Sequence, residues 1–281
     1  MTRISMESIV EAVNDLPALP HVVVRVMELT EDPDSTADDI SNVLNQDQAM
    51  TARVLRLANS AFYGFARRIS TINDAIIFLG FKTIRSIVMA VSVSDILSGE
   101  VEGYALEHGE LWKHSQCTAM AARLIARKAK FGFLDLAYTA GLLHDIGKVI
   151  LNSFMKEAYH EVVAKVSEEN ASFIDTENEI LGFNHAMVGA RVAEKWNLPK
   201  ELVEAIAFHH HPEKAEINKR LTAIVHLGDT VCVMMGIGIG IDGMLYPVSE
   251  EALNLLGFKE ADMEIIISEL IDVFADQQSL L

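Results

Sequence analysis

The stretch Gly141-Leu142-Leu143-His144-Asp145-Ile146-Gly147-Lys148-Val149-Ile150-Leu151 places an ionisable pair inside an apolar run. Burying an imidazole and a carboxylate together costs free energy unless they are paired or bind a metal. Neighbouring side chains on a helix point about 100° apart, so the two would approach one metal, or two adjacent metals, from two sides. Lys148 follows His144 by one turn and would meet an anion held there. A lone His-Asp dipeptide is more often a core pair, so the metal hypothesis depends on the other ionisable residues.

Composition bounds the class of protein. The 281 residues carry a net charge of −17 and are 50% hydrophobic, enough for a full core in one large domain or two lobes. The acidic balance argues against binding to nucleic acid or to an anionic membrane. No signal peptide or membrane-spanning apolar run is visible, and two cysteines provide no disulfide framework. We therefore expect a cytoplasmic protein.

Apolar residues recur with helical spacing along almost the whole chain, and no run alternates with the period of a strand. The segment from Gly99 to Gly103, with acids and glycines among few apolar residues, is typical of a joint between lobes. We therefore expect an all-α protein with two packed helical lobes, residues 1–100 and 104–281. In the second lobe we expect a long helix from about Tyr104 to Ala129 and a helix that carries His144 and Asp145.

Basic residues are concentrated in the first lobe. Residues 51 to 90 hold six basic residues and one acid, whereas residues 246 to 281 hold eight acids and one base. The asymmetry indicates either solvated helix faces or a surface for a partner or anionic ligand, with contributions from Arg53, Arg56 and Arg85. The helix–glycine–helix pattern of residues 71–97 has too few basic and base-reading side chains for DNA recognition.

Five predicted helices each carry one or two side chains of the kinds that bind metals, mostly at helix ends or on apolar faces. Glu110 and His114, for example, are four residues apart and face the same way. A cluster rich in imidazole with a few carboxylates suits iron, manganese or zinc better than magnesium or calcium. The candidate ligands are Glu110, His114, His144, Asp145, His185, His209, His210 and Asp229.

These donors are too many for one tetrahedral zinc, which takes four. We therefore expect two divalent transition-metal ions, iron or manganese rather than zinc, with Asp145 bridging them. Two such ions activate a water against a phosphodiester, and Asp145 and Lys148 would then be the catalytic residues.

Five further motifs stand out: Leu16-Pro17-Ala18-Leu19-Pro20, Asp47 to Leu55, Leu57 to Gly64, Ala75 to Gly80, and Trp196-Asn197-Leu198-Pro199. Together they resemble the signature of the HDOD family over roughly residues 10–230. HDOD domains are all-helical bacterial signalling modules related to the HD superfamily of metal phosphohydrolases. The resemblance implies an HD-type helical core in the second lobe, where the metal site would lie.

The resemblance also implies roles for individual residues. The pattern H…HD…D of the HD superfamily is matched by His114, His144, Asp145 and Asp229. The HD-GYP branch of that superfamily cleaves cyclic di-GMP and has extra metal ligands. Four residues of this chain resemble those extra ligands: Glu110, His185, His209 and His210. The Gly-Tyr-Pro motif of that branch is absent, which argues against cyclic di-GMP cleavage but not against metal binding.

Two functions remain open at this point. In the first, the chain is a regulatory signalling module that retains an HD-type metal site and acts on a signalling protein partner or a phosphorylated small molecule. In the second, it is a metal-dependent phosphohydrolase that cleaves a nucleotide or a cyclic dinucleotide. The family favours the module and the full ligand set favours the enzyme, and we place the module first.

Overall fold

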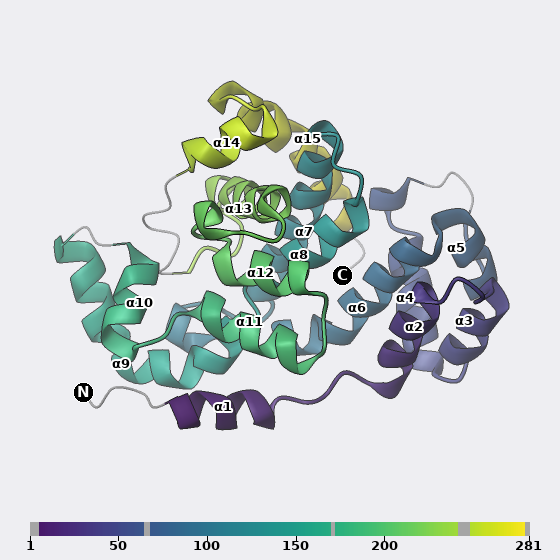
Figure 1. The fold of residues 1–281 in the computed structure, drawn as a ribbon, viewed down its shortest axis with the longest axis horizontal. Coiled ribbons are helices and arrows are strands. Elements are labelled where there is room, and N and C mark those ends of the chain that lie inside the picture. The colour runs from purple at the N-terminus through teal and green to yellow at the C-terminus, as the bar shows by residue number, and fades with distance from the viewer. Residues whose placement is uncertain (1–5, 65–67, 170–171, 241–247, 279–281) are drawn as a thin grey trace. The chain divides into compact units, whose positions relative to one another are not determined.

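The computed structural model describes residues 6–64, 68–169, 172–240 and 248–278, which are helical in most of their length (Figure 1). Within those ranges the only β pairing is a single bridge between Val101 and Leu106. The expected all-α class is therefore confirmed.

The chain divides into two compact units, one of residues 18–95 and 268–281 (the small unit) and one of residues 1–17 and 96–267 (the large unit). The first elements are α1 (Met6–Asp15), α2 (His21–Glu31), α3 (Ala37–Leu44), α4 (Gln48–Ala58), η1 (Ala61–Tyr63), α5 (Ile72–Leu79), α6 (Phe81–Leu97) and η2 (Glu102–Tyr104). The next are α7 (Glu110–Lys128), α8 (Leu134–Leu143), α9 (Gly147–Glu169), α10 (Phe173–Leu181), α11 (His185–Lys195) and α12 (Lys200–Phe208). The last are η3 (Pro212–Lys214), α13 (Lys219–Met234), α14 (Glu250–Leu256) and α15 (Glu260–Gln278).

Helix α1 belongs with the large unit because a lysine from α11 holds its last turn. The carbonyl groups at a helix C-terminus lack partners within the helix. Lys195 donates hydrogen bonds to the carbonyl oxygens of Val13, Asn14 and Leu16 at 2.9, 2.9 and 2.8 Å. The indole of Trp196 donates to the carbonyl of Pro17 at 3.3 Å. The Trp-Asn-Leu-Pro motif thus begins with a residue that fixes the N-terminal segment.

Helix α4 anchors the small unit with one face. Asp47 caps its first turn by accepting a hydrogen bond from the amide of Met50 at 2.9 Å. Met50, Val54 and Ala58 recur every four residues and are buried, so this stripe faces the core of the unit. The opposite face of α4 is left toward solvent.

Two of the arginines proposed to form a surface in the first lobe make ion pairs inside the small unit. Arg53 donates to Asp95 at 2.6 and 3.1 Å and to the hydroxyl of Ser94 at 2.9 Å. Arg85 pairs with Glu31 at 2.8 Å. Their charges are therefore compensated locally, and their use by a partner remains a prediction.

Helix α7 is the centre of the large unit, and glycines bring its neighbours α8 and α13 close to it. A Cβ placed on Gly141 of α8 would lie 2.8 Å from the carbonyl oxygen of Thr118. A Cβ on Gly228 of α13 would lie 3.1 Å from the amide nitrogen of Ala122. Because the backbones approach closely at both crossings, the end of α8 and the middle of α13 lie against the same part of α7.

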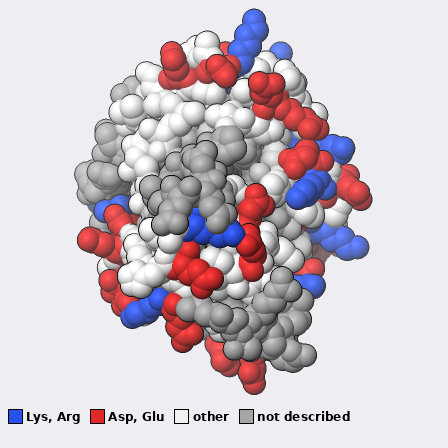
Figure 2. Space-filling model, turned by 90° about the vertical axis from the view of Figure 1, so that its left-hand side faces the viewer, with Lys and Arg blue, Asp and Glu red and all other residues white. Residues whose placement is uncertain are grey.

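The surface carries more acid than base, as the net charge requires. Figure 2 shows one face on which Asp and Glu side chains are spread both around the margin and near the centre, with fewer Lys and Arg among them. In the described part of the chain, no helix combines the length and the apolar character needed to cross a bilayer.

One buried carboxylate is expected to contribute strongly to stability. Glu204 is 6% exposed and accepts hydrogen bonds from the amides of Glu216, Ile217 and Asn218 at 2.6, 2.7 and 2.6 Å. We expect Glu204→Ala to lower the free energy of unfolding by about 3 kcal/mol, because three amides lose a charged acceptor. Urea unfolding measures the change. The matched control is Glu216→Ala, which removes an exposed carboxylate of the same loop and should leave stability nearly unchanged.

Candidate metal centre

His144 and Asp145 lie in the turn between α8 and α9, so the expectation of a helix through both was wrong. Helix α8 ends at Leu143, His144 is its C-cap, and α9 begins at Gly147. Gly147 lets the start of α9 pack directly on α11, because a Cβ there would lie 1.9 Å from the carbonyl oxygen of His185. The turn therefore touches the backbone of α11, which brings the His-Asp pair next to His185.

The first group of donors surrounds one oxygen of Asp145. The Nε2 atom of His114 lies 2.9 Å from Asp229 Oδ1 and 3.6 Å from Asp145 Oδ2. The Nε2 atom of His144 lies 3.3 Å from Asp145 Oδ2 and 3.5 Å from Asp229 Oδ1. All four side chains are buried. Helices α7 and α13 and the α8–α9 turn thus direct two imidazoles and two carboxylates at one point.

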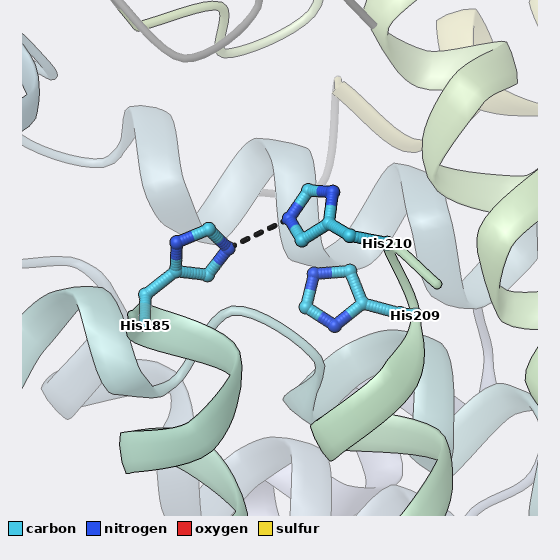
Figure 3. A group of neighbouring side chains, drawn as sticks. All are labelled: His185, His209 and His210. Atoms are coloured by element: carbon cyan, nitrogen blue, oxygen red, sulfur yellow. Dashed lines mark hydrogen bonds between the residues drawn. The ribbon is translucent and has the colours of Figure 1, made fainter. Parts of the chain in front are cut away.

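A second group lies on the other oxygen of Asp145. The Nε2 atoms of His185 and His210 are 2.8 Å apart, with His209 beside them (Figure 3). Asp145 Oδ1 lies 3.4 Å from His185 Nε2 and 3.8 Å from His209 Nε2. Asp145 therefore stands between the two groups and offers one oxygen to each.

Backbone carbonyls set the tautomers of these histidines. His144 and His209 each have Nδ1 at 2.7 and 2.8 Å from the carbonyl oxygen three residues earlier. His114 Nδ1 lies 3.0 Å from the carbonyl oxygen of Ile237. A carbonyl only accepts hydrogen bonds, so each Nδ1 must carry the proton. Each Nε2 is then the ring atom that faces the cluster, and once it is unprotonated its lone pair is directed at a metal.

Two of these inward atoms lack a conventional partner. The Nε2 atoms of His144 and His209 are buried and have no hydrogen bond from any described residue. Buried polar atoms nearly always have a hydrogen-bond partner. Two imidazole nitrogens without one, both beside the same carboxylate, therefore indicate a binding site for a cation. Three overlapping sets of donors each lie within 4.8 Å of one another: His114, His144 and Asp229; His144, Asp145 and His209; and His185, His209 and His210. The site thus fits a divalent metal.

Electrostatics favour the same conclusion. Burial by itself would lower the pKa of His144, but the carboxylates of Asp145 and Asp229 raise it to about 10. Burial and the neighbouring imidazoles hold the pKa of His209 and of His210 well below the usual range. His209 and His210 are therefore neutral imidazoles, and a cation entering the first group would displace a proton from His144.

Glu177 is a site residue that no motif in the sequence marks. It is fully buried, and its Oε2 lies 2.7 Å from His185 Nδ1. Its Oε1 accepts a hydrogen bond from the Tyr104 hydroxyl at 2.5 Å. A carboxylate in this position fixes the ring orientation of a metal-binding histidine and raises its basicity. In the sequence, Glu177 could have been recognised as a charged residue on the apolar, buried face of α10, between Ile174 and Leu181.

The remaining candidates have different surroundings. Among the described residues, Glu110 belongs to neither group, and its Oε2 accepts a hydrogen bond from the amide of Glu107 at 2.7 Å. Its role as a ligand stays a prediction. Lys148 is buried with its Nζ 2.6 Å from Asp145 Oδ2, so the ammonium is held at the site. His226 donates from Nδ1 to the carbonyl of His209 at 2.8 Å and supports that ligand's backbone.

Fold and site together define an all-α protein with a buried centre of histidine and aspartate suited to a divalent metal. Residues 16–212 match the HDOD domain, and the chain belongs to the HDOD family.

The chain is also similar to three individual proteins. An HDOD domain protein of unknown function from Geobacter sulfurreducens is 30% identical, with a TM-score of 0.77 over 99% of both chains. A candidate phosphohydrolase from Shewanella amazonensis SB2B is 26% identical, with a TM-score of 0.73 over 98% of both chains. An uncharacterised protein of Treponema pallidum (strain Nichols) is 30% identical over 78% of this chain. The match spans only 42% of the length of that relative.

Proposed function

We propose that the chain is a regulatory HDOD module whose large unit carries a working two-metal phosphohydrolase centre. The observation that carries the proposal is the position of Asp145. Its Oδ2 faces His114 and His144, and its Oδ1 faces His185 and His209. A carboxylate between two groups of donors, each with an orphaned imidazole, is the arrangement that a bridged metal pair needs.

The donor set favours iron or manganese. One ion would be held by His114, His144, Asp145 and Asp229, and the other by Asp145, His185, His209 and His210. Mixed imidazole and carboxylate donors suit these metals. When bound, two such ions lower the pKa of a water and polarise a phosphate oxygen.

The protein's own residues orient the site and balance its charge. The carbonyl contacts of His144 and His209 keep their Nε2 atoms directed inward. Lys148 is the cation nearest to Asp145, at 2.6 Å, and would neutralise negative charge that develops on a phosphate oxygen. We infer that the substrate is a phosphorylated small molecule such as a nucleotide, and that a signalling protein partner receives the output. We also propose that the module acts in the cytoplasm and binds neither nucleic acid nor membrane.

Metal analysis coupled to a hydrolysis assay tests the proposal. The protein is reconstituted with Mn²⁺ or Fe²⁺, dialysed, and assayed with bis-p-nitrophenyl phosphate and p-nitrophenyl phosphate. We expect two ions per chain and hydrolysis that a chelator abolishes. Fewer than one ion per chain would contradict the metal centre. Two ions without hydrolysis of nucleotides or of either probe would favour the second candidate function, a signalling module with a structural or sensory metal, which the missing Gly-Tyr-Pro motif also favours.

Lys148→Ala should separate chemistry from metal binding. We expect the variant to keep both ions and to lose about 100-fold in kcat, because one charge that stabilises the transition state is removed. Metal content and kcat are measured on the same preparation. Lys156→Ala is the control, since that exposed lysine of α9 pairs only with Glu102 among the described residues. Equal kcat for wild type and Lys148→Ala would exclude the assigned role.

Glu177→Gln should weaken the binding of one of the two metal ions and leave the binding of the other unchanged. The amide keeps the size of the carboxylate but loses the charge that supports His185, so we expect roughly 10- to 100-fold weaker binding of one of the two ions. A competition titration with a chromogenic chelator resolves the two affinities. Glu179→Gln, on the exposed side of α10, should bind both ions normally. Unchanged affinities in Glu177→Gln would show that the contact is only structural.

A further inference from the structure

The solvent-facing side of α4 forms a second polar site, in the small unit and separate from the metal centre. Ala52 lies three residues before Leu55 and four before Arg56, and the C-cap Asn59 lies four after Leu55 and three after Arg56, so the four residues share one face of the helix. This face and residues 68–70 line a surface cavity of about 810 Å³. That volume lies in the range of roughly 300–1,000 Å³ typical of small-molecule sites.

Asn59 fixes the second wall of the cavity. Its Oδ1 accepts a hydrogen bond from the amide of Ile69 at 2.7 Å, and its Nδ2 donates to the carbonyl of Ile69 at 2.8 Å. The same Nδ2 donates to the carbonyl of Leu55 at 2.7 Å, which ties the segment to α4. Ile69 is 3% exposed, whereas Arg68 and Ser70 on either side of it are exposed. The wall is therefore held in place and leaves an arginine and a hydroxyl at the opening.

Among the side chains that the structure describes, no acid offsets the charge of the cavity. In the described ranges, neither Arg56 nor Arg68 has an ion pair, and no carboxylate lines the cavity. Arg53 and Arg85 of the same unit, in contrast, are paired with Asp95 and Glu31. Two guanidinium groups at one cavity stand out in a chain with a net charge of −17.

The chemistry of the walls indicates the ligand. Guanidinium groups bind phosphate through paired, charge-assisted hydrogen bonds. Leu55 and Ala52 supply an apolar surface beside them, on which a flat base can rest. We propose that this cavity binds a nucleoside monophosphate, with its phosphate on Arg56 and Arg68 and its base against the apolar wall. The proposal does not depend on the activity of the metal centre.

Calorimetric titration of the full chain with AMP and GMP tests the site. We expect saturable binding by wild type, and at least about tenfold weaker binding by Arg56→Gln and by Arg68→Gln. Adenosine, which lacks the phosphate, should bind at least about tenfold more weakly than AMP. The matched control is Arg25→Gln, because Arg25 is an exposed arginine of the same unit that pairs with Glu28 at 2.7 Å. Both cavity arginines are exposed, so the variants should keep the wild-type melting temperature.

His144→Ala distinguishes this cavity from the metal centre. We expect that variant to bind AMP as wild type does. Binding that is lost in His144→Ala and kept in the arginine variants would place the nucleotide at the metal centre and overturn the proposal. No saturable binding of AMP or GMP by wild type, or adenosine binding as tight as AMP binding, would overturn it as well.

Discussion

Replacing His144 with alanine is expected to abolish both metal binding and hydrolysis. His144 Nε2 is 3.3 Å from Asp145 Oδ2 and 3.5 Å from Asp229 Oδ1, so the side chain contacts both carboxylates of the first group. Its loss removes one ligand and leaves two buried carboxylates with less positive charge to offset them. Metal content by elemental analysis should fall below one ion per chain, and hydrolysis should fall to the background rate. The control is His160→Ala, an exposed histidine of α9. A His144→Ala protein that retains two ions would refute the assignment.

The protonation of His144 provides a further readout of the same variant. With its pKa raised to about 10 by the two carboxylates, His144 is protonated at neutral pH, and a metal must displace that proton. Metal affinity should therefore increase with pH up to about 10. In the metal-free protein, the stabilisation from protonated His144 is complete below its unfolded pKa of about 6.5 and is lost as pH rises toward 10. Calorimetry in buffers of different ionisation enthalpy counts the protons released on binding.

Replacing Gly147 with alanine should have the largest effect on stability. The added Cβ would lie 1.9 Å from the carbonyl oxygen of His185 and 2.6 Å from the amide nitrogen of Gly189. Both are backbone atoms of α11 and cannot rotate away, so α9 and α11 must separate. We expect the free energy of unfolding to fall by about 3 kcal/mol or more.

The same separation should damage the metal centre, because Gly147 lies between the His144-Asp145 turn and His185. Asp145 would move away from the second group, and we expect one of the two ions to be lost. Gly132→Ala is the matched control, since its Cβ would meet nothing within 4 Å. That variant should change stability by less than about 0.5 kcal/mol. If Gly147→Ala unfolds at the wild-type urea concentration and keeps both ions, the close crossing has no such role.

The sequence predicted the helices better than it predicted where they begin. The helix expected from about Tyr104 starts instead at Glu110, after the turn η2. Ala105 and Gly109 have φ of 56° and 82°, which an α-helix cannot accommodate. The apolar period runs through this turn because Tyr104 is buried, but its partners lie far along the chain: its ring packs on Phe173 and its hydroxyl donates to Glu177, 73 residues later. The spacing of apolar residues thus indicates which side chains are buried, but not whether they lie in a helix or in a turn.

What the sequence by itself determined is the helical class and the supply of donors. Helical spacing and the His144-Asp145 pair in an apolar run were enough to predict a buried metal site. Only the tertiary structure decided how these donors divide into two groups. His114 and Asp229 are 115 residues apart in sequence, yet Nε2 of the first lies 2.9 Å from Oδ1 of the second. Glu110 lies one turn before His114, but its carboxylate accepts a hydrogen bond from the amide of Glu107, just before α7 begins. Such choices depend on backbone crossings at Gly141, Gly147 and Gly228, whose close approaches are set by distant partners and not by their neighbours in sequence.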